Sequence, residues 1–145
     1  MRLYFAYGSN MDRAHMAKLC RGAEASGIAS AENQLYFVAA AGYASMTPRR
    51  NARTYGVLWK INAQHIAKLN AYESVESGLY ASSAIPVRHN GKLLRAMIYY
   101  ALEAKPGYPK PGYQENVVAA ARSWDFPQDY LAHLEKFLPR AAGSV

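Results

Sequence analysis

Cysteine is almost absent from this sequence, since Cys20 is the only one among 145 residues. A lone cysteine cannot form an internal disulfide, which favours a reducing compartment. Long apolar runs are absent too. No stretch approaches the roughly 18 residues that a membrane-spanning helix needs, and the opening MRLYFAYGSN holds no run long enough for a signal peptide. We therefore expect a soluble, cytoplasmic protein that does not enter a membrane.

The motifs of several catalytic classes are also missing. The four histidines are His15, His65, His89 and His133. They lie far apart without metal-binding spacing, so we predict no metal site and give them structural roles. Ser9 lacks the G-x-S-x-G frame and has no identifiable histidine partner, which argues against a serine hydrolase.

Positive charge is in excess, because 17 Lys and Arg face 10 Asp and Glu for a net charge of +7. That balance allows a nucleic-acid or small-anion partner. The basic residues are scattered, however, apart from Arg49, Arg50 and Arg53, and no nucleic-acid-binding motif accompanies them. We interpret this trio as part of a solvated loop; the alternative is an arginine that meets a substrate carboxylate at a pocket rim. Nucleic-acid binding is therefore a weak alternative.

Apolar residues are plentiful, at 51% of the chain, and 12 of them are tyrosines. This length and composition fit a single domain over residues 1–145 with a core of its own. Tyrosine combines an apolar ring with a hydroxyl group, so it suits the wall of a ligand pocket.

Alternating and helical spacings outline a mixed α+β domain. Strands are predicted over residues 3–7, 34–40, 54–60, 79–88 and 92–101, and helices over 13–19, from Asn62 to about 70, 117–124 and 130–138. Asp12 and Asn62 are the expected helix caps, and Asn90-Gly91 is the expected hairpin turn. Residues 42–53 and 105–113 are predicted to be irregular. Together these elements predict a strongly curved sheet with helices packed around it.

The segment YFAYGSNM, residues 4–11, is the first candidate site. A strand is predicted to end at Gly8-Ser9-Asn10, directly before a helix N-terminus. Such a turn leaves backbone N–H groups beside the positive end of the helix dipole, where they can hold a carboxylate or an oxyanion. Similar sequences also form ordinary turns, so local reasoning leaves both interpretations open.

The segment LNAYESVESGLY, residues 69–80, is the second candidate site. It places Glu73 and Glu76 between the end of a helix and the start of a strand. The negative end of a helix dipole disfavours a carboxylate charge, and a tyrosine-lined pocket would raise the pKa of such a group toward values suited to proton transfer. The alternative is two solvated surface acids, which composition alone favours.

Four motifs in a fixed order make this sequence similar to a known family. They are YFAYGSNM at 4–11, TYGVLWKIN at 54–62, YESVESGLY at 72–80 and PGYQENVVAAARSWDFPQDYLAHL at 111–134. Through them the chain resembles the γ-glutamylcyclotransferases and the related AIG2-like proteins over residues 3–139. Four ordered matches are far more specific than any one of them.

The resemblance implies a small mixed β-barrel with surrounding helices, and a cyclisation that needs no metal or cofactor. The α-amine of a γ-glutamyl compound attacks its own γ-carbonyl, which releases 5-oxoproline and an amine or amino acid. Glu73 matches the catalytic glutamate of the family and would act as general acid/base. The positions implied to bind the substrate are Tyr7, Gly8, Ser9, Asn10, Tyr80 and Tyr113.

The sequence also departs from the family pattern. Ser74 stands where the family often has glycine, so the backbone after Glu73 is expected to differ. Glu76 adds a second acid, which we expect to face solvent. Residues 42–53 match the family poorly, so γ-glutamyl amino acids and γ-glutamyl amines are not distinguished as substrates, and oligomeric state is not readable. A catalytically inactive module that binds small anions or nucleic acid on the same fold is the alternative function.

Overall fold

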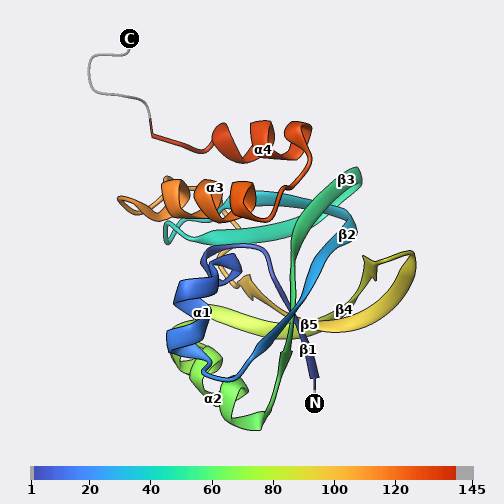
Figure 1. Cartoon of the computed structure of the whole chain (residues 1–145). Helices are drawn as coiled ribbons and strands as arrows, with labels where there is room; N and C mark the ends of the chain where they lie inside the picture. The colour runs from blue at the N-terminus through green and yellow to red at the C-terminus, as the bar shows by residue number, and fades with distance from the viewer. Residues whose placement is uncertain (1, 140–145) are drawn as a thin grey trace.

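A closed five-stranded barrel forms the centre of the computed structural model, which describes residues 2–139 (Figure 1). The strands are β1 Arg2–Ala6, β2 Glu24–Val38, β3 Ala44–Ile61, β4 Tyr80–His89 and β5 Lys92–Ala101. Their order around the barrel is β1-β3-β2-β4-β5. The pairs are antiparallel except β1 with β5, which is parallel and closes the barrel. The expected α+β fold with a curved, barrel-like sheet is therefore confirmed.

Helices cover two sides of the barrel. They are the short 3-10 helix η1 Ser9–Met11 and the α-helices α1 Arg13–Leu19, α2 Ala63–Tyr72, α3 Tyr113–Ser123 and α4 Gln128–Glu135. In Figure 1, α1 and α2 lie next to each other, whereas α3 and α4 lie one over the other above the β2–β3 ribbon. No helix within the described residues has the length and apolar character of a membrane-spanning segment.

The helix starts follow the predicted capping chemistry. The Asp12 carboxylate accepts a hydrogen bond from the Ala14 N–H at 3.0 Å and starts α1. Asn62 starts α2 in a capping box with His65, in which each side chain bonds the backbone N–H of the other. These caps fix where the two helices begin, and thereby where α2 ends next to Glu73.

The hairpin between β4 and β5 also forms as predicted. Asn90 and Gly91 have φ angles of +51° and +78°, which the two central residues of this tight turn require. Pro86 pairs only with Arg95 of β5, and β2 meets β4 only at Arg88. Pro86 therefore lies in a part of β4 that pairs with a strand on one side only, a position that suits proline.

The prediction that residues 42–53 form a loop is wrong, because β3 begins at Ala44 and continues through them. The register runs from Val38–Ala44 to Gln34–Pro48 and resumes at Glu32–Arg53, so residues 49–52 bulge out of the ladder. Pairing with β2 overrides the local preference of this small, polar and basic segment. As a result a long β2–β3 ribbon brings its turn, residues 39–43, to the side of the barrel that holds the candidate site.

The segment that precedes α3 is irregular, as predicted. Its one bridge to the sheet joins Pro106 to Ala39, next to the β2–β3 turn. A buried hydrogen-bond chain then fixes α3 on the ribbon: the Tyr36 hydroxyl donates to Gln114 Oε1 at 2.8 Å, and Gln114 Nε2 donates to the Leu134 carbonyl at 2.9 Å. This chain also holds Tyr113, the first residue of α3, at the edge of the barrel.

Candidate active site

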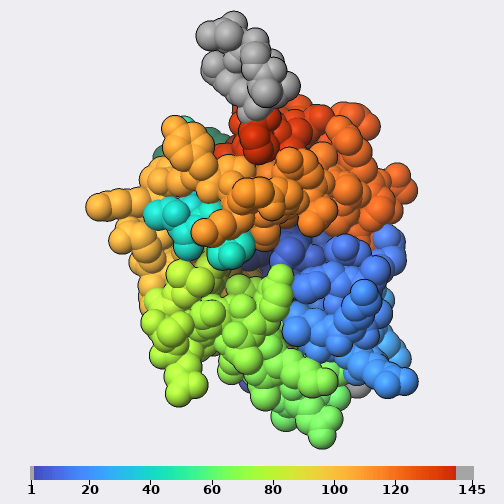
Figure 2. All heavy atoms as spheres, turned by 90° about the vertical axis from the view of Figure 1, so that its left-hand side faces the viewer, coloured from blue at the N-terminus to red at the C-terminus, as the bar shows by residue number. Residues whose placement is uncertain are grey.

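A cavity of about 210 Å³ opens where segments far apart in the sequence meet. Figure 2 shows the hollow bordered by the N-terminal segment in blue, the β2–β3 turn in cyan, the end of α2 in green and the start of α3 in orange. The described residues that line it are Tyr4, Tyr7, Gly8, Ser9, Asn10, Tyr43, Ala44, Tyr72, Glu73, Ser74, Leu79, Tyr80, Tyr99 and Tyr113. The cavity therefore unites all seven residues that the sequence singled out, from both candidate segments.

Glu73 is the only Asp, Glu, Lys or Arg among these lining residues. It is the C-cap of α2, where its N–H donates to the Leu69 carbonyl at 2.8 Å. Burial among tyrosine rings raises the pKa of its carboxyl group to about 7. A carboxyl group with that pKa exchanges a proton readily near neutrality, which is the property required of a general acid/base.

The backbone after Glu73 turns sharply. Ser74 has a φ of +53°, in the left-handed region that favours glycine, and its carbonyl accepts a hydrogen bond from the Leu79 N–H at 3.1 Å. The turn thus keeps the conformation that a glycine would adopt most easily, although serine occupies the position. The expectation that serine changes the backbone here finds no support in this geometry.

Glu76 is exposed and does not line the cavity, as predicted. We therefore expect Glu76→Gln to leave the rate of any reaction in the cavity within about twofold of wild type, because a solvated charge outside the site is screened. Steady-state kinetics of the purified variant checks this. A loss comparable to that of a Glu73 variant would show that Glu76 is the reactive carboxylate.

The YGSN loop contributes both backbone and side chains to the cavity. The loop was predicted to lead directly into a helix. In the structure the 3-10 helix η1 lies between the loop and α1. Within residues 2–139, the N–H groups of Gly8 and Asn10 have no hydrogen-bond acceptor. They are therefore available to a bound carboxylate or oxyanion.

The side chains of this loop are held in place by the barrel. The Tyr7 hydroxyl donates to the Tyr99 carbonyl at 2.5 Å, and Asn10 Nδ2 donates to the Tyr4 hydroxyl at 2.8 Å. Asn10 Oδ1 is buried without a partner among the described residues. The loop side chains are therefore fixed mainly by the hydrogen bonds of Tyr7 and Asn10 Nδ2.

Gly8 is required for packing. Its φ is −123°, which any residue can adopt, so it does not supply a left-handed conformation. A Cβ at Gly8 would lie 2.6 Å from the Tyr113 hydroxyl and 3.1 Å from the Ala44 Cβ. Glycine is therefore needed for the close approach of the loop to α3.

Tyr80 and Tyr113 enclose the Ala44 backbone from two sides. The Tyr80 hydroxyl donates to the Ala44 carbonyl at 2.5 Å, and the Tyr113 hydroxyl accepts from the Ala44 N–H at 3.2 Å. Burial raises the pKa of both hydroxyls, so both stay protonated at neutral pH. The Tyr80 proton is occupied, whereas the Tyr113 proton is available for a ligand. Of the two, Tyr113 fits a substrate donor and Tyr80 fits a wall residue.

Sequence reasoning missed four further tyrosines that line the cavity: Tyr4, Tyr43, Tyr72 and Tyr99. Two of them had a local signal, because Tyr4 belongs to the YGSN motif and Tyr72 precedes Glu73. Tyr43 and Tyr99 had none, since only the pairing of the strands brings them to the cavity. The Tyr99 hydroxyl donates to Asn70 Oδ1 at 2.6 Å and so ties β5 to the end of α2.

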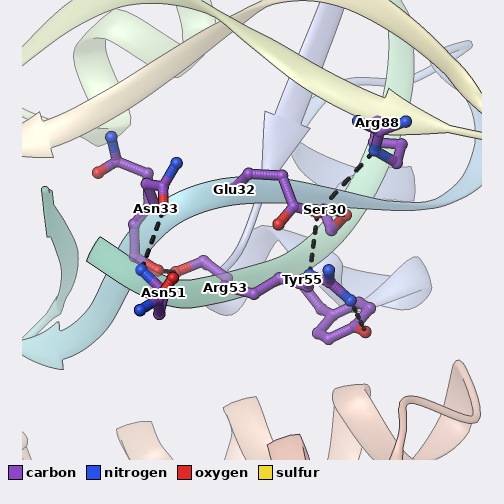
Figure 3. A network of polar contacts seen from close by, with 9 residues as sticks. Ser30, Glu32, Asn33, Asn51, Arg53, Tyr55 and Arg88 are labelled. Atoms are coloured by element: carbon purple, nitrogen blue, oxygen red, sulfur yellow. Dashed lines mark hydrogen bonds and ion pairs between the residues drawn. The ribbon is translucent and has the colours of Figure 1, made fainter. Parts of the chain in front are cut away.

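The arginine trio lies away from the cavity. Figure 3 shows Arg53 on the β2–β3 ribbon, where its Nε pairs with Glu32 Oε1 at 2.9 Å and Nη1 donates to the Tyr55 hydroxyl at 3.3 Å. Arg49 and Arg50 are exposed in the bulge of the same ribbon. No arginine of the described chain lines the cavity, so the preferred interpretation, a solvated surface, fits, although the segment is strand and not loop.

In the described part of the chain, no three His, Cys, Asp or Glu side chains come together in a group that could bind a metal ion. Three of the histidines lie within hydrogen-bond distance of backbone carbonyls: His65 Nε2 is 2.7 Å from Arg21 O, His89 Nδ1 is 2.8 Å from Ile28 O and His133 Nε2 is 3.0 Å from Tyr36 O. Cys20 is buried and packs in the core.

Known proteins resemble the chain in sequence and fold. The sequence profile of the AIG2-like family matches residues 53–134. The γ-glutamylcyclotransferases of mouse (Mus musculus) and human (Homo sapiens) are 27% and 28% identical to it over 148 and 152 residues, and each match covers 94% of this chain and 79% of the relative. A solved structure of a γ-glutamyl cyclotransferase superposes with a TM-score of 0.88 at 23% identity, covering 99% of this chain and 92% of that one. The structural likeness confirms the fold.

Proposed function

Because the chain belongs to the AIG2-like family and is an enzyme of the γ-glutamylcyclotransferase type, we propose that it releases 5-oxoproline from a γ-glutamyl compound with Glu73 as general acid/base. One observation carries the proposal. Among residues 2–139, Glu73 has the only carboxyl group that lines the cavity, its pKa is raised to about 7, and it shares that cavity with the YGSN loop.

The attacking nitrogen gives up two protons in the course of the reaction. Glu73 takes the first from the α-ammonium of the substrate, and the freed amine attacks the γ-carbonyl to form a new C–N bond within the same molecule. Glu73 gives this proton to the leaving nitrogen as its bond to the γ-carbon breaks. The ring nitrogen then releases its second proton through Glu73, and the amine departs as an ammonium ion. The products are the five-membered lactam 5-oxoproline and a free amine, and no other reactant is consumed. The cavity contributes by folding the substrate back on itself and by placing the carboxyl group.

The negative charge of the substrate would be bound by uncharged hydrogen-bond donors, since no Lys or Arg of the described chain lines the cavity. The N–H groups of Gly8 and Asn10 and the Tyr113 hydroxyl are the available donors for the α-carboxylate or the oxyanion. The Glu73 carboxylate is the acceptor for the α-ammonium. The same arrangement weakens the alternative of a small-anion binding module, because the Glu73 carboxylate would repel a bound anion.

The proposal is tested by 5-oxoproline release from a panel of γ-glutamyl amino acids and γ-glutamyl amines. Release by the wild-type protein and loss of release in Glu73→Gln would support both the reaction and the acid/base. If no member yields 5-oxoproline, the proposed reaction is wrong. Salt-sensitive retention on immobilised nucleic acid would in that case favour the binding module.

The pH profile provides a separate prediction. Glu73 must be ionised to accept the proton, so we expect kcat/KM to rise with pH and to level off above the Glu73 pKa of about 7. Initial rates between about pH 5 and 9, at substrate concentrations well below KM, measure this limb. A profile that is flat from about pH 5 to 8 would show that no group with this pKa controls the reaction.

A further inference from the structure

Exposed apolar residues occur at the cavity and on the segments next to it. Five large hydrophobic residues of the described chain are exposed: Tyr43 (36%), Tyr72 (45%), Leu93 (62%), Leu102 (54%) and Tyr108 (92%). Leu93 belongs to β5 near its hairpin turn. The other four come from segments that border the cavity. Single exposed apolar residues are ordinary, but a group of them beside a cavity indicates a binding surface.

Two members of this group form the edge of the cavity itself. Tyr43 and Tyr72 both line it. The Tyr43 ring packs edge-on against Tyr113 with ring centres 5.3 Å apart, and the Tyr72 ring lies 5.0 Å from His15 with its hydroxyl 3.3 Å from Ser9 Oγ. Each ring is therefore supported on one side, and remains partly exposed.

The other two extend this edge outward. The Leu102 N–H donates to the carbonyl of Leu79, a cavity-lining residue, at 3.2 Å. The carbonyl of Tyr108 lies beside the β2–β3 turn, because a Cβ on Gly42 would come within 3.2 Å of it. Figure 2 shows these segments adjoining on one side of the hollow, in cyan, yellow-green and yellow-orange. We call Tyr43, Tyr72, Leu102 and Tyr108 the apolar rim.

The interior and the rim suit different halves of a substrate. The interior holds Glu73 and the hydrogen-bonding groups in about 210 Å³, a volume small for a whole drug-sized ligand but suited to a glutamyl group. The leaving half must therefore emerge across the rim. Charges near the rim have both signs, with Lys105 and Lys110 on the segment before α3 and Glu76 and Glu103 close by in sequence to lining or rim residues. Exposed apolar area is therefore the property that the four residues of the apolar rim share, whereas no single sign of charge prevails near them.

We propose that the apolar rim selects γ-glutamyl compounds whose leaving amine carries an aromatic or large aliphatic side chain. This inference rests on the proposed function and names the substrate class within it. The side chain of the leaving amine packs on the rim, and its burial lowers the free energy of the bound and transition states for apolar leaving groups.

The test compares γ-glutamyl-phenylalanine with γ-glutamyl-glycine on the wild-type protein. The expected ratio of their kcat/KM values is at least about tenfold in favour of phenylalanine, a typical size for hydrophobic discrimination. The double variant Leu102→Ser/Tyr108→Ser removes only exposed side chains outside the cavity. Its ratio is expected to fall by at least about threefold, whereas Leu93→Ser, the matched control on an exposed apolar residue elsewhere, keeps the wild-type ratio.

The outcomes separate this inference from the function on which it rests. Equal kcat/KM values for 5-oxoproline release from the two compounds would show that the apolar rim does not select the leaving group. The proposed cyclotransferase reaction would still be supported. A high ratio that the double variant keeps overturns the assignment to these residues. Absence of 5-oxoproline from both compounds and from the wider panel overturns the function itself, and the rim with it. Because each measurement is a ratio within one protein, partial loss of folded protein does not alter it.

Discussion

Glu73→Gln is expected to lower kcat for 5-oxoproline release by at least about a thousandfold, with KM within about threefold of wild type. Glutamine has the size and shape of glutamate, so the cavity keeps its form. Its amide cannot take a proton from the α-ammonium or return one to the leaving nitrogen. Steady-state kinetics with the best substrate of the panel measures the loss.

The same substitution is expected to increase stability at high pH. The folded protein raises the pKa of Glu73 from 4.5 to about 7, so between these values it keeps a proton that the unfolded chain has lost. The free energy of unfolding therefore falls as pH rises through this window, by about 3 kcal/mol at most, and then levels off. Glu73→Gln has no such loss. Denaturant unfolding should show the variant more stable than wild type at pH 8 and equal to it at pH 4.

Kinetics and denaturant unfolding together distinguish the two possible causes of an inactive Glu73→Gln variant. Inactivity together with raised stability at pH 8 is the signature of a folded protein that lacks its acid/base. Inactivity together with lowered stability would indicate a disturbed cavity, and wild-type turnover would show that Glu73 is not the acid/base. Glu76→Gln, measured in parallel, carries the same chemical change at a solvated position.

Gly8→Ala is expected to reduce kcat/KM by about a hundredfold and to lower the free energy of unfolding by about 1–3 kcal/mol. The backbone at Gly8 accepts alanine, but the new methyl group would lie 2.6 Å from the Tyr113 hydroxyl. Tyr113 is half-buried and must shift, which breaks its hydrogen bond with the Ala44 N–H and moves a donor out of the cavity. Kinetics and denaturant unfolding of the single variant measure both effects.

A second variant identifies the cause. Tyr113→Phe removes the hydroxyl group with which the methyl collides, so Gly8→Ala should cost clearly less stability when it is added to Tyr113→Phe than when it is added to wild type. Equal costs in the two backgrounds would show that the Ala44 contact, at 3.1 Å, or the backbone itself is responsible. The hydroxyl would then have no part in the requirement for glycine.

Local chemistry made much of this fold predictable. Asp12, Asn62 and Asn90-Gly91 each act on the backbone within a few residues, and the structure contains all three devices as predicted. The cavity was only partly predictable in this way. The YGSN loop and Glu73 each follow the end of a regular element, where local chemistry allows a binding or reactive group but also an ordinary turn or a solvated acid. The four motifs in their fixed order, and not local chemistry, singled out Glu73.

Features that depend on distant pairing were not predictable. Residues 44–53 have the composition of a loop and become strand only because β2 lies beside them. Tyr43 and Tyr99 reach the cavity through the register of two different strand pairs, which no local spacing reveals. The requirement for Gly8 comes from a hydroxyl group more than a hundred residues further along the chain. That residues 1–145 form a single domain stays a prediction.

The hydrogen bond between the Tyr7 hydroxyl and the Tyr99 carbonyl joins residues 92 positions apart. It lies at the contact where the parallel strands β1 and β5 close the barrel, and a contact between residues so far apart in the sequence costs loop-closure entropy before it stabilises the fold. The cavity takes walls from both sides of this closure, since Tyr7 follows β1 and Tyr99 belongs to β5. Recovery of activity on refolding is therefore expected to require the closure of β1 on β5 as well as the pairing of β1 with β3.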